Sequence, residues 1–343
     1  MRRMAMTMAL CGALAGSGCS PAGGGSAPGS PHAQGAGQES LVPPSARYVT
    51  PEGKVRVVGY NDMDQMLEAL GGIFEERHPG IRFEWVLEGT RFAPPPLIDG
   101  TSAFAPMGAE MEPVQLAAWK RTYDQEPLAV PVAHDSLTPG ALSSPTGVFV
   151  HASNPVHSIS MEALRRAIAP RPGEKRVERW HELGVPDAAG HVPIRPVGLE
   201  EDTAIGALML RRLGSERYVK EFVRMRQSRD VAAAVAQAPD ALGIANLNHA
   251  SPEIRALTIV DDSGREVAGD AEGIRSGLYP LDRQLLVYVR QDPGGRVEPL
   301  AHAFLCLALS EEGQGVIAAG SRGYLPLNPQ EIAAARQSIG GCP

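Results

Sequence analysis

The order strand, helix, strand that begins near residue 55 constrains the fold of this chain most. Residues 55–60 (VRVVGY) are β-rich and end in a turn, and residues 81–89 (IRFEWVLEG) alternate like a second strand. Between them, apolar residues recur at helical spacing: Met66, Leu67, Leu70, Ile73 and Phe74. Such a βαβ unit predicts parallel strands with a right-handed crossover, and ligands of these sheets bind in loops beyond the carboxyl ends of the strands. Those loops begin here at Tyr60 and Glu88.

Strand and helix patterns alternate through the rest of the chain, and no internal repeat is present. Further strands are predicted at 128–137, 147–153, 193–199, 241–250 and 283–289. A capped helix is predicted at 160–168, and further helices are predicted at 203–214, 215–225 and 230–239. Residues 297–321 are predicted to form two helices separated near Gly313. This alternation predicts an α/β protein.

Length and charge bound the class of protein. A chain of 343 residues with 43% hydrophobic residues is long enough for two domains, each with its own core. The net charge of −7 arises from 32 Lys and Arg against 39 Asp and Glu, without a basic block. A nucleic-acid-binding surface needs a concentrated cationic face, so this class of function is excluded.

The first twenty residues (MRRMAMTMALCGALAGSGCS) have the pattern of an export signal. Two arginines precede an apolar run, 4–15, that is too short to span a bilayer as a mature helix. Small residues then lead to Cys19 as in the lipobox of bacterial lipoproteins, although Gly16 stands where Leu is usual. The sequence therefore predicts a signal peptide at 1–18 and lipidation of Cys19. This protein would be extracytoplasmic and membrane-anchored, in the periplasm or cell envelope, with ordinary secretion as the alternative.

After Cys19 the composition changes to Gly, Ser, Pro and Ala. Residues 20–46 hold almost no large apolar side chain and cannot offset their ordering entropy, so we expect a flexible, lipid-anchored tether across 19–49. Of the four cysteines, only Cys306 and Cys342 would remain in the mature body. An oxidising compartment permits these two to pair, and the alternative is a buried free Cys306 with Cys342 in the tail.

Several segments together carry a resemblance to a known family. They are HPGIRFEWVLEG (78–89), GTSAFAPM (100–107), PVAHDSL (131–137), NPVHSISMEALRRAI (154–168), ALGIANL (241–247), GLYPLDRQLLVYV (277–289) and LSEEGQGVIAAGSRGYLPLNP (309–329). In this order and spacing, the chain resembles the phosphate-type periplasmic substrate-binding proteins of ABC transporters. The resemblance covers about residues 55–329 and places the chain in the type 2 periplasmic-binding-protein superfamily.

This resemblance implies a two-lobed α/β fold with mixed, mostly parallel sheets flanked by helices and a cleft between the lobes. Because such chains cross twice between lobes, the first lobe is expected at 50–133 plus 275–335, the second at 134–274 and a tail at 336–343. The implied function is an extracytoplasmic solute-binding lipoprotein of an ABC-type importer. Its expected partners are the permease subunits and a small anion, phosphate or a related oxyanion.

The ligand loops of this family can be located in the chain, although they depart from the family pattern. The candidate ligand-binding residues are Tyr60, Asn61, Asp62, Thr90, Arg91, Gly108, Ala109, Asp135, Arg195, Asp202 and Thr203. Asn61 and Asp62 can cap the helix that follows them. Family members surround the oxyanion with Ser or Thr hydroxyls, helix N-terminal N–H groups and one Arg.

Here several hydroxyl positions are replaced, and carboxylates are added at Asp62, Glu88 and residues 200–202. Repulsion between these carboxylates and a phosphate dianion predicts weaker phosphate binding than is typical of the family. Arg91 and Arg195 are the cations expected to compensate, as bidentate donors to the anion.

The chain shows no pattern for metal, cofactor or enzyme chemistry. Its nine histidines lack metal-ligand spacing, and it contains no P-loop, GxSxG motif or Cys/His nucleophile pair, so we expect none of these functions. The altered ligand loops leave an alternative function open. That alternative is a two-lobed, non-transport receptor or envelope interaction protein that has lost oxyanion binding.

Overall fold

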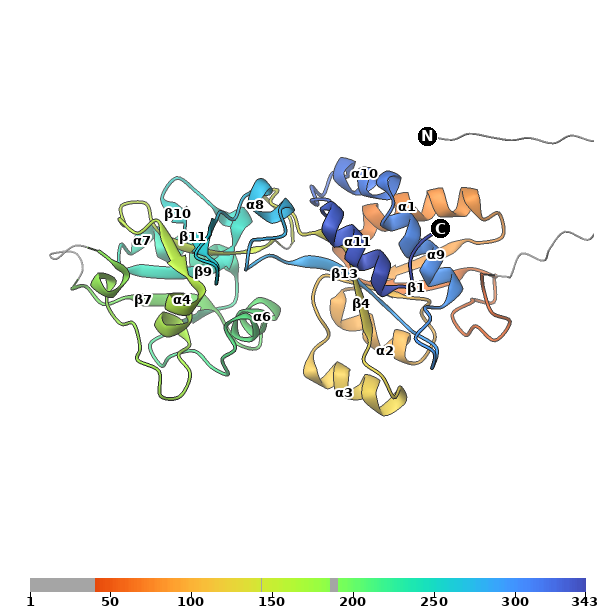
Figure 1. Ribbon diagram of the computed structural model, residues 1–343, viewed down its shortest axis with the longest axis horizontal. Coiled ribbons are helices and arrows are strands. Elements are labelled where there is room, and N and C mark those ends of the chain that lie inside the picture. Colours follow the sequence, from red (N-terminus) through yellow and green to blue (C-terminus); the bar gives the residue numbers. More distant parts are fainter. Residues whose placement is uncertain (1–40, 143, 186–190) are drawn as a thin grey trace, which may run out of the picture. The chain divides into compact units, whose positions relative to one another are not determined.

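The computed structural model describes residues 41–142, 144–185 and 191–343 (Figure 1). The predicted signal peptide, Cys19 and the predicted tether up to residue 40 lie outside these residues. Within the described part, strands and helices alternate and confirm the α/β class.

The predicted βαβ unit is present. The strands β1 (Val55–Gly59) and β2 (Phe83–Leu87) are parallel neighbours, and α1 (Asp64–Arg77) connects them. On the buried face of α1, Met66, Leu67, Leu70 and Phe74 are at most 5% exposed. Gly71 allows the helix to lie close to β2, because a Cβ atom at this position would be 2.7 Å from the Trp85 ring.

A three-stranded antiparallel sheet has the order β3 (Ala105–Met107), β13 (Gln284–Val289), β4 (Leu128–His134). Its central strand, β13, comes from the last quarter of the sequence. The helices α2 (Pro94–Ile98) and α3 (Pro113–Thr122) pack against each other. The buried Trp119 of α3 donates its indole N–H to the carbonyl oxygen of Gln125 at 2.9 Å.

Three helices complete the chain: α9 (Pro299–Ala308), α10 (Glu311–Ala319) and α11 (Pro329–Ser338). The two helices predicted in 297–321 are present, but they separate at residues 309–310 and not near Gly313. The Ser310 hydroxyl accepts a hydrogen bond from the Gly313 amide at 3.0 Å. The break therefore falls where a side chain can cap α10, and Gly313 lies in the first turn of that helix.

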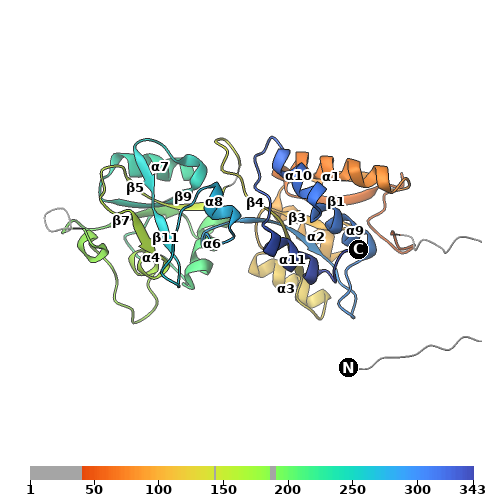
Figure 2. The same ribbon diagram turned by 45° about the horizontal axis from the view of Figure 1, so that its top comes forward.

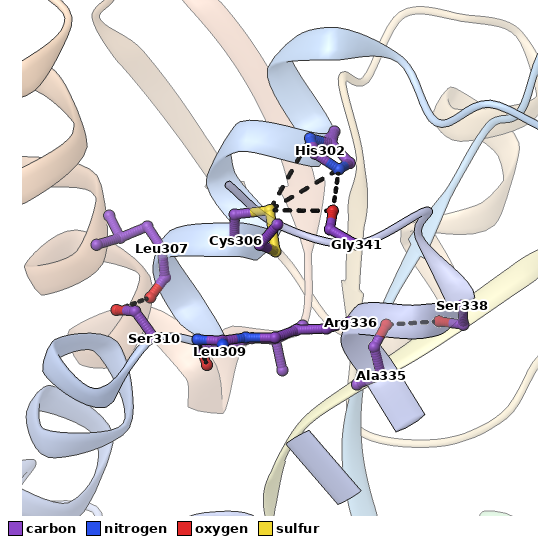
Figure 3. The surroundings of a disulfide bond; sticks show 10 residues. His302, Cys306, Leu307, Leu309, Ser310, Ala335, Arg336, Ser338 and Gly341 are labelled. Carbon is purple, nitrogen blue, oxygen red and sulfur yellow. Dashed lines mark hydrogen bonds between the residues drawn. A yellow bond between two sulfur atoms is a disulfide. The ribbon is translucent and has the colours of Figure 1, made fainter. Parts of the chain in front are cut away.

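A disulfide joins Cys306 of α9 to Cys342 (Figure 3). The open question about these cysteines is thus answered in favour of pairing, and their Cα atoms are 5.6 Å apart, in the usual range for a disulfide. His302 lies one turn earlier on α9, with its Nε2 atom 2.7 Å from the carbonyl oxygen of Gly341 (Figure 3). The bridge ties the end of the chain to α9.

The middle of the chain forms a five-stranded sheet in the order β10 (Ile254–Ala256), β5 (Thr146–His151), β9 (Ala241–Asn246), β7 (Arg195–Leu199), β8 (Val223–Met225). A smaller sheet has the order β12 (Glu266–Val267), β11 (Thr258–Val260), β6 (Ser158–Ser160). The helices of this region are α4 (Met161–Ile168), α6 (Ala204–Leu213), α7 (Ser228–Gln237) and α8 (Ala271–Arg275) (Figure 2). As predicted, α4 is capped: the Ser160 hydroxyl accepts from the Ala163 amide at 3.0 Å.

Residues 215–225 do not form the predicted helix. Helix α6 ends at Gly214 in the left-handed region, with φ of 59°, and the chain then runs irregularly to β8. The buried rings of Tyr218 and Phe222 stack with centroids 3.9 Å apart. Residues 223–225 pair with β7, so the sheet uses backbone groups that a helix would need, and tertiary pairing overrides the local helical pattern.

The sheets are mixed, whereas the family resemblance predicts mostly parallel ones. Among the described strands, four pairs are parallel (β1–β2, β6–β11, β7–β8, β7–β9) and five are antiparallel. Buried hydrophobic residues form one large core within 148–281, a second large core from 48–133 together with 285–339, and a smaller cluster from 93–119 with Tyr288. The two large cores agree with two lobes, and the residue bounds of the lobes stay a prediction.

The folded body begins before the predicted end of the tether at residue 49. Tyr48 is 2% exposed, and its hydroxyl lies 2.5 Å from the Glu298 carboxylate. The Arg290 guanidinium lies over the Tyr48 ring, 5.6 Å from its centre. Burial of this ring offsets the ordering entropy of the segment, which corrects the predicted boundary.

Candidate functional site

Three predicted ligand loops meet at the carboxyl ends of β1, β2 and β3. The Tyr60 amide donates to the carbonyl oxygen of Pro106 at 2.9 Å, and the Gly89 amide donates to that of Gly59 at 3.0 Å. The Thr90 hydroxyl accepts a hydrogen bond from the Gly108 amide at 3.1 Å. The structure therefore brings Tyr60, Thr90 and Gly108 together, as the βαβ argument predicts.

The Tyr60 ring lies directly against Gly108. A Cβ atom at residue 108 would be 2.4 Å from the ring, which is closer than atoms can approach. Gly108 is buried, and its neighbour Ala109 is half-buried. The contact explains why glycine follows β3 here.

Asp62 is fully buried and is paired within the protein. Its Oδ1 atom lies 3.1 Å from Nη1 of Arg322, and Nη2 of Arg322 lies 2.9 Å from Asp64. Burial raises the pKa of Asp62, and the charge of Arg322 opposes this effect. The predicted capping role is wrong, because α1 has no side-chain cap at its start, and Asn61 is exposed.

Tyr324 connects this pair to the neighbouring loops. It is buried, and its hydroxyl donates to the main-chain carbonyl of Asp62 at 2.7 Å. Burial and the nearby charges of Asp62 and Asp135 raise the pKa of Tyr324 far above its ordinary value, so this side chain is a neutral donor.

Asp135 faces Arg283, a residue that the sequence did not single out. The Asp135 amide donates to the carbonyl oxygen of Arg283 at 2.8 Å, and their side chains approach to 3.8 Å. Asp135 also accepts from the Ser136 amide at 2.9 Å. Arg283 is only 8% exposed and donates to the carbonyl oxygen of Gly108 at 2.6 Å. This buried guanidinium therefore lies beside the cluster of Tyr60, Thr90 and Gly108.

His134, the last residue of β4, forms a second buried charge cluster. Its Nδ1 atom lies 2.7 Å from Asp282, and its Nε2 atom lies 3.0 Å from Glu331 of α11. Burial by itself lowers the pKa of His134, but the hydrogen bonds and charges of Asp282 and Glu331 outweigh burial and raise the pKa to about 9. The ring is therefore an imidazolium near neutral pH, since both nitrogens donate to carboxylates.

Sequence reasoning missed Arg283, His134 and Asp282. A signal was present, because the segments PVAHDSL and YPLDRQLL place charged residues within otherwise apolar strands. Charged side chains are almost never fully buried unless they are paired. The partners of His134 are Asp282 and Glu331, which lie 148 and 197 residues from it in the sequence. The pairing itself could therefore not be predicted from the sequence.

The polar side chains of the predicted ligand loop after β7 bind other groups of the protein. Thr203 caps α6, because its hydroxyl accepts from the Gly206 amide at 3.0 Å. Arg224 binds Glu201 at 2.6 Å, and Arg226 lies 2.9 Å from Glu200 and 3.3 Å from Asp202. The carboxylates that the sequence placed in this loop are thus matched by two arginines that follow in and after β8.

The two arginines predicted to compensate lie elsewhere. Arg195 is exposed at the amino end of β7, at the opposite end of this strand from residues 200–203. Arg91 is 69% exposed in its side chain and lies 3.3 Å from Glu112. The structure therefore does not bring either residue to the Arg283 cluster.

Arg91 and Glu88 instead line a separate cavity of about 610 Å³ beside β1 and β2. Val58, Val86, Phe92 and two prolines of α2 supply its apolar walls. Its other charged residues, Arg56 and Glu84, pair at 2.7 Å.

Within residues 41–142, 144–185 and 191–343, none of the helices combines the length and the hydrophobicity that a membrane span requires. The same residues contain no group of three or more His, Cys, Asp or Glu side chains arranged to hold a metal ion.

Comparison with known proteins identifies relatives along most of the chain. Residues 28–312 match the family model described as a PBP superfamily domain. The phosphate-binding protein PstS of Pseudomonas aeruginosa PAO1 is 27% identical over 286 residues, which cover 82% of this chain and 85% of the relative. The PstS protein of P. aeruginosa UCBPP-PA14 matches equally.

Two solved structures share the fold. PstS from Borrelia burgdorferi superposes with a TM-score of 0.54 at 14% identity, covering 80% of this chain and 98% of that one. An ABC-type phosphate transport receptor from Vibrio cholerae gives a TM-score of 0.52 at 13% identity, covering 79% and 98%. The predicted two-lobed, periplasmic-binding-protein-like fold is thereby confirmed.

Proposed function

This chain belongs to the family described as a PBP superfamily domain. On this basis we propose that it is the extracytoplasmic solute-binding component of an ABC-type importer. Its proposed ligand is phosphate or a related oxyanion, the ligand named for the Pseudomonas aeruginosa relatives. The alternative of a non-transport receptor is not favoured, since the relatives are named as phosphate-binding proteins. We assign the chain no catalytic role.

The observation that carries the ligand proposal is the buried Arg283. It lies beside three loops at the carboxyl ends of strands, where α/β sheets bind ligands. A guanidinium offers several N–H donors in one plane and suits bidentate contact with an oxyanion. The nearby Asp135 carboxylate can accept the proton of a protonated oxyanion, which would favour hydrogen phosphate over sulfate.

Affinity is expected to be lower than is typical of the family. Arg283 already donates to Gly108, and Asp135 lies 3.8 Å from its guanidinium. An entering phosphate must displace or share these contacts and meets the negative charge of Asp135. Tyr60, Thr90 and Gly108 are the other proposed contacts within this cluster, and Asp202 and Thr203 remain proposed contacts of the second lobe.

Calorimetric titration of the purified protein with phosphate and with sulfate tests this function. Arg283→Ala should weaken phosphate binding by roughly ten- to hundredfold, as expected when a charge-assisted hydrogen bond is lost. Arg195→Ala is the matched control and should bind like the wild type, since Arg195 lies at the amino end of β7. Absence of phosphate binding to the wild type, or full affinity in Arg283→Ala, would contradict the assignment.

We further propose that the protein is anchored to the membrane through a lipid on Cys19, outside the described residues, and that permease subunits of the importer receive its ligand. The lipobox-like sequence before Cys19 supports the anchor. Labelled palmitate should enter the wild type and not Cys19→Ala. Equal labelling of both proteins would refute the anchor while leaving the ligand proposal intact.

A further inference from the structure

Two charge clusters lie on opposite faces of the segment where β4 meets the start of β13. Consecutive residues of an extended strand point to opposite faces. His134 contacts Asp282 and Glu331 of α11, whereas the next residues, Asp135 and Arg283, face each other, and Arg283 also contacts the loop after β3. Residues 134–135 and residues 282–283 are thus two neighbouring dipeptides, and each dipeptide contributes one residue to each cluster.

Main-chain hydrogen bonds hold these dipeptides together. The Asp135 amide donates to the carbonyl oxygen of Arg283 at 2.8 Å. His134 exchanges main-chain hydrogen bonds with Leu325, at 2.9 Å and 3.3 Å. A movement of the His134 cluster would therefore displace the main chain that carries Arg283.

We propose that His134, clamped as an imidazolium between Asp282 and Glu331, is a positioning residue that holds Arg283 in place for a bound oxyanion. This inference rests on the proposed function. His134 itself is fully buried and acts through Arg283, so it makes no contact with the ligand.

The physical reason is charge balance. Asp282 and Glu331 have only 13% and 18% of their side chains exposed, and His134 supplies the positive charge between them. If the imidazolium loses its proton, the nearly buried carboxylates of Asp282 and Glu331 no longer have a positive charge between them. Their repulsion then favours separation of the segments that carry them, or protonation of one carboxylate.

Further polar and titratable groups surround this cluster. Gln284 of β13 donates to Glu331 at 3.1 Å, and the Asn328 amide donates to it at 2.9 Å. Arg212 of α6 contacts only the main-chain oxygen of Asp282, at 3.5 Å. The charge of Asp282 reaches the buried Tyr279, whose pKa is raised mainly by burial, so this phenol stays neutral. The pH response in the mildly alkaline range is thus expected to come from His134.

Phosphate titrations between about pH 8 and about pH 10 test the inference, because phosphate stays largely a dianion there while His134, with a pKa of about 9, loses its proton. Wild-type affinity should fall through this range. His134→Gln should bind on the order of tenfold more weakly at the lower pH and lose the pH dependence. In the double variant His134→Gln/Asp282→Asn, part of the affinity should return, because one unbalanced carboxylate is removed.

His302→Gln is the control, since it makes the same change at a half-buried histidine outside this cluster. It should keep the wild-type affinity and pH profile. An unchanged phosphate affinity in His134→Gln, or a wild-type affinity that is flat with pH, would overturn the positioning role even if the variant is less stable.

Hydrogen exchange of the unliganded protein separates this inference from the proposed function. The Asp135 amide should exchange faster in His134→Gln than in the wild type or in His302→Gln, and the double variant should recover protection. If the wild type binds no phosphate at any pH, the proposed function fails, and the exchange result alone decides whether His134 orders this segment. Equal protection of the Asp135 amide in all four proteins would reject the clamp.

Discussion

Reducing the bond between Cys306 and Cys342 should lower the thermal stability of this protein by a predictable amount. The two residues are 36 apart in sequence, so the bridge closes a loop of that size in the unfolded chain. The chain-entropy relation for such a loop gives a stabilisation of about 4 kcal/mol at room temperature. With an unfolding entropy of about 2.1 cal/mol/K per residue over roughly 300 residues, this corresponds to a fall in Tm of about 6 °C.

Differential scanning calorimetry with and without dithiothreitol measures the effect. The variant Cys306→Ala/Cys342→Ala should melt near the reduced wild type, and reductant should not lower its Tm further. The bridge joins α9 to Cys342, whereas Arg283 contacts Gly108 and Asp135, so phosphate affinity should not change. If the oxidised wild type and the double variant melt at the same temperature, the bond does not form or the loop argument is wrong.

Two further predictions concern the charged and close-packed groups at the strand ends. His134 has a pKa of about 9 in the folded protein against an ordinary value of 6.5, so its stabilisation is complete below about pH 6.5 and is lost as the pH rises through about 9. Urea unfolding should show a loss of about 3 kcal/mol across this window, and His134→Gln should remove most of the pH dependence. Gly108→Ala places a Cβ atom 2.4 Å from the Tyr60 ring and should destabilise the fold by about 1–3 kcal/mol. Phosphate affinity measured in the same variant should fall, because Tyr60 must move; a variant with wild-type stability and affinity would show that the contact is unimportant.

The sequence by itself predicted those parts of the molecule whose causes are local. The apolar spacing of α1 and the alternation in the flanking strands were enough to predict the βαβ unit, because side-chain direction in helices and strands follows from backbone geometry. The loops that begin at Tyr60 and Glu88 followed from that unit. The Ser160 cap was also predicted, since it needs only its own helix.

Local patterns failed where distant segments competed for the same backbone. Residues 215–225 have a helical pattern, yet residues 223–225 pair with β7, and two stacked aromatic rings are buried before them. Tyr48 stands in a segment of tether-like composition, yet Glu298 and Arg290 hold it. Composition and periodicity carry no information about partners that are hundreds of residues away.

Only the tertiary structure decided which charges meet. The sequence nominated Arg91 and Arg195 as bidentate cations near the predicted ligand loops, but Arg195 lies at the opposite end of β7 from residues 200–203. Arg283 lies against Gly108, 175 residues away, and Asp282 lies against His134, because β13 returns to lie between β3 and β4. Glu331 reaches His134 because α11 packs against β4. Each buried charge needs a partner of opposite charge, because an unpaired ion in the interior costs on the order of 3–5 kcal/mol. Which partner it finds depends on strand order and register, and these emerge only when the whole chain has folded.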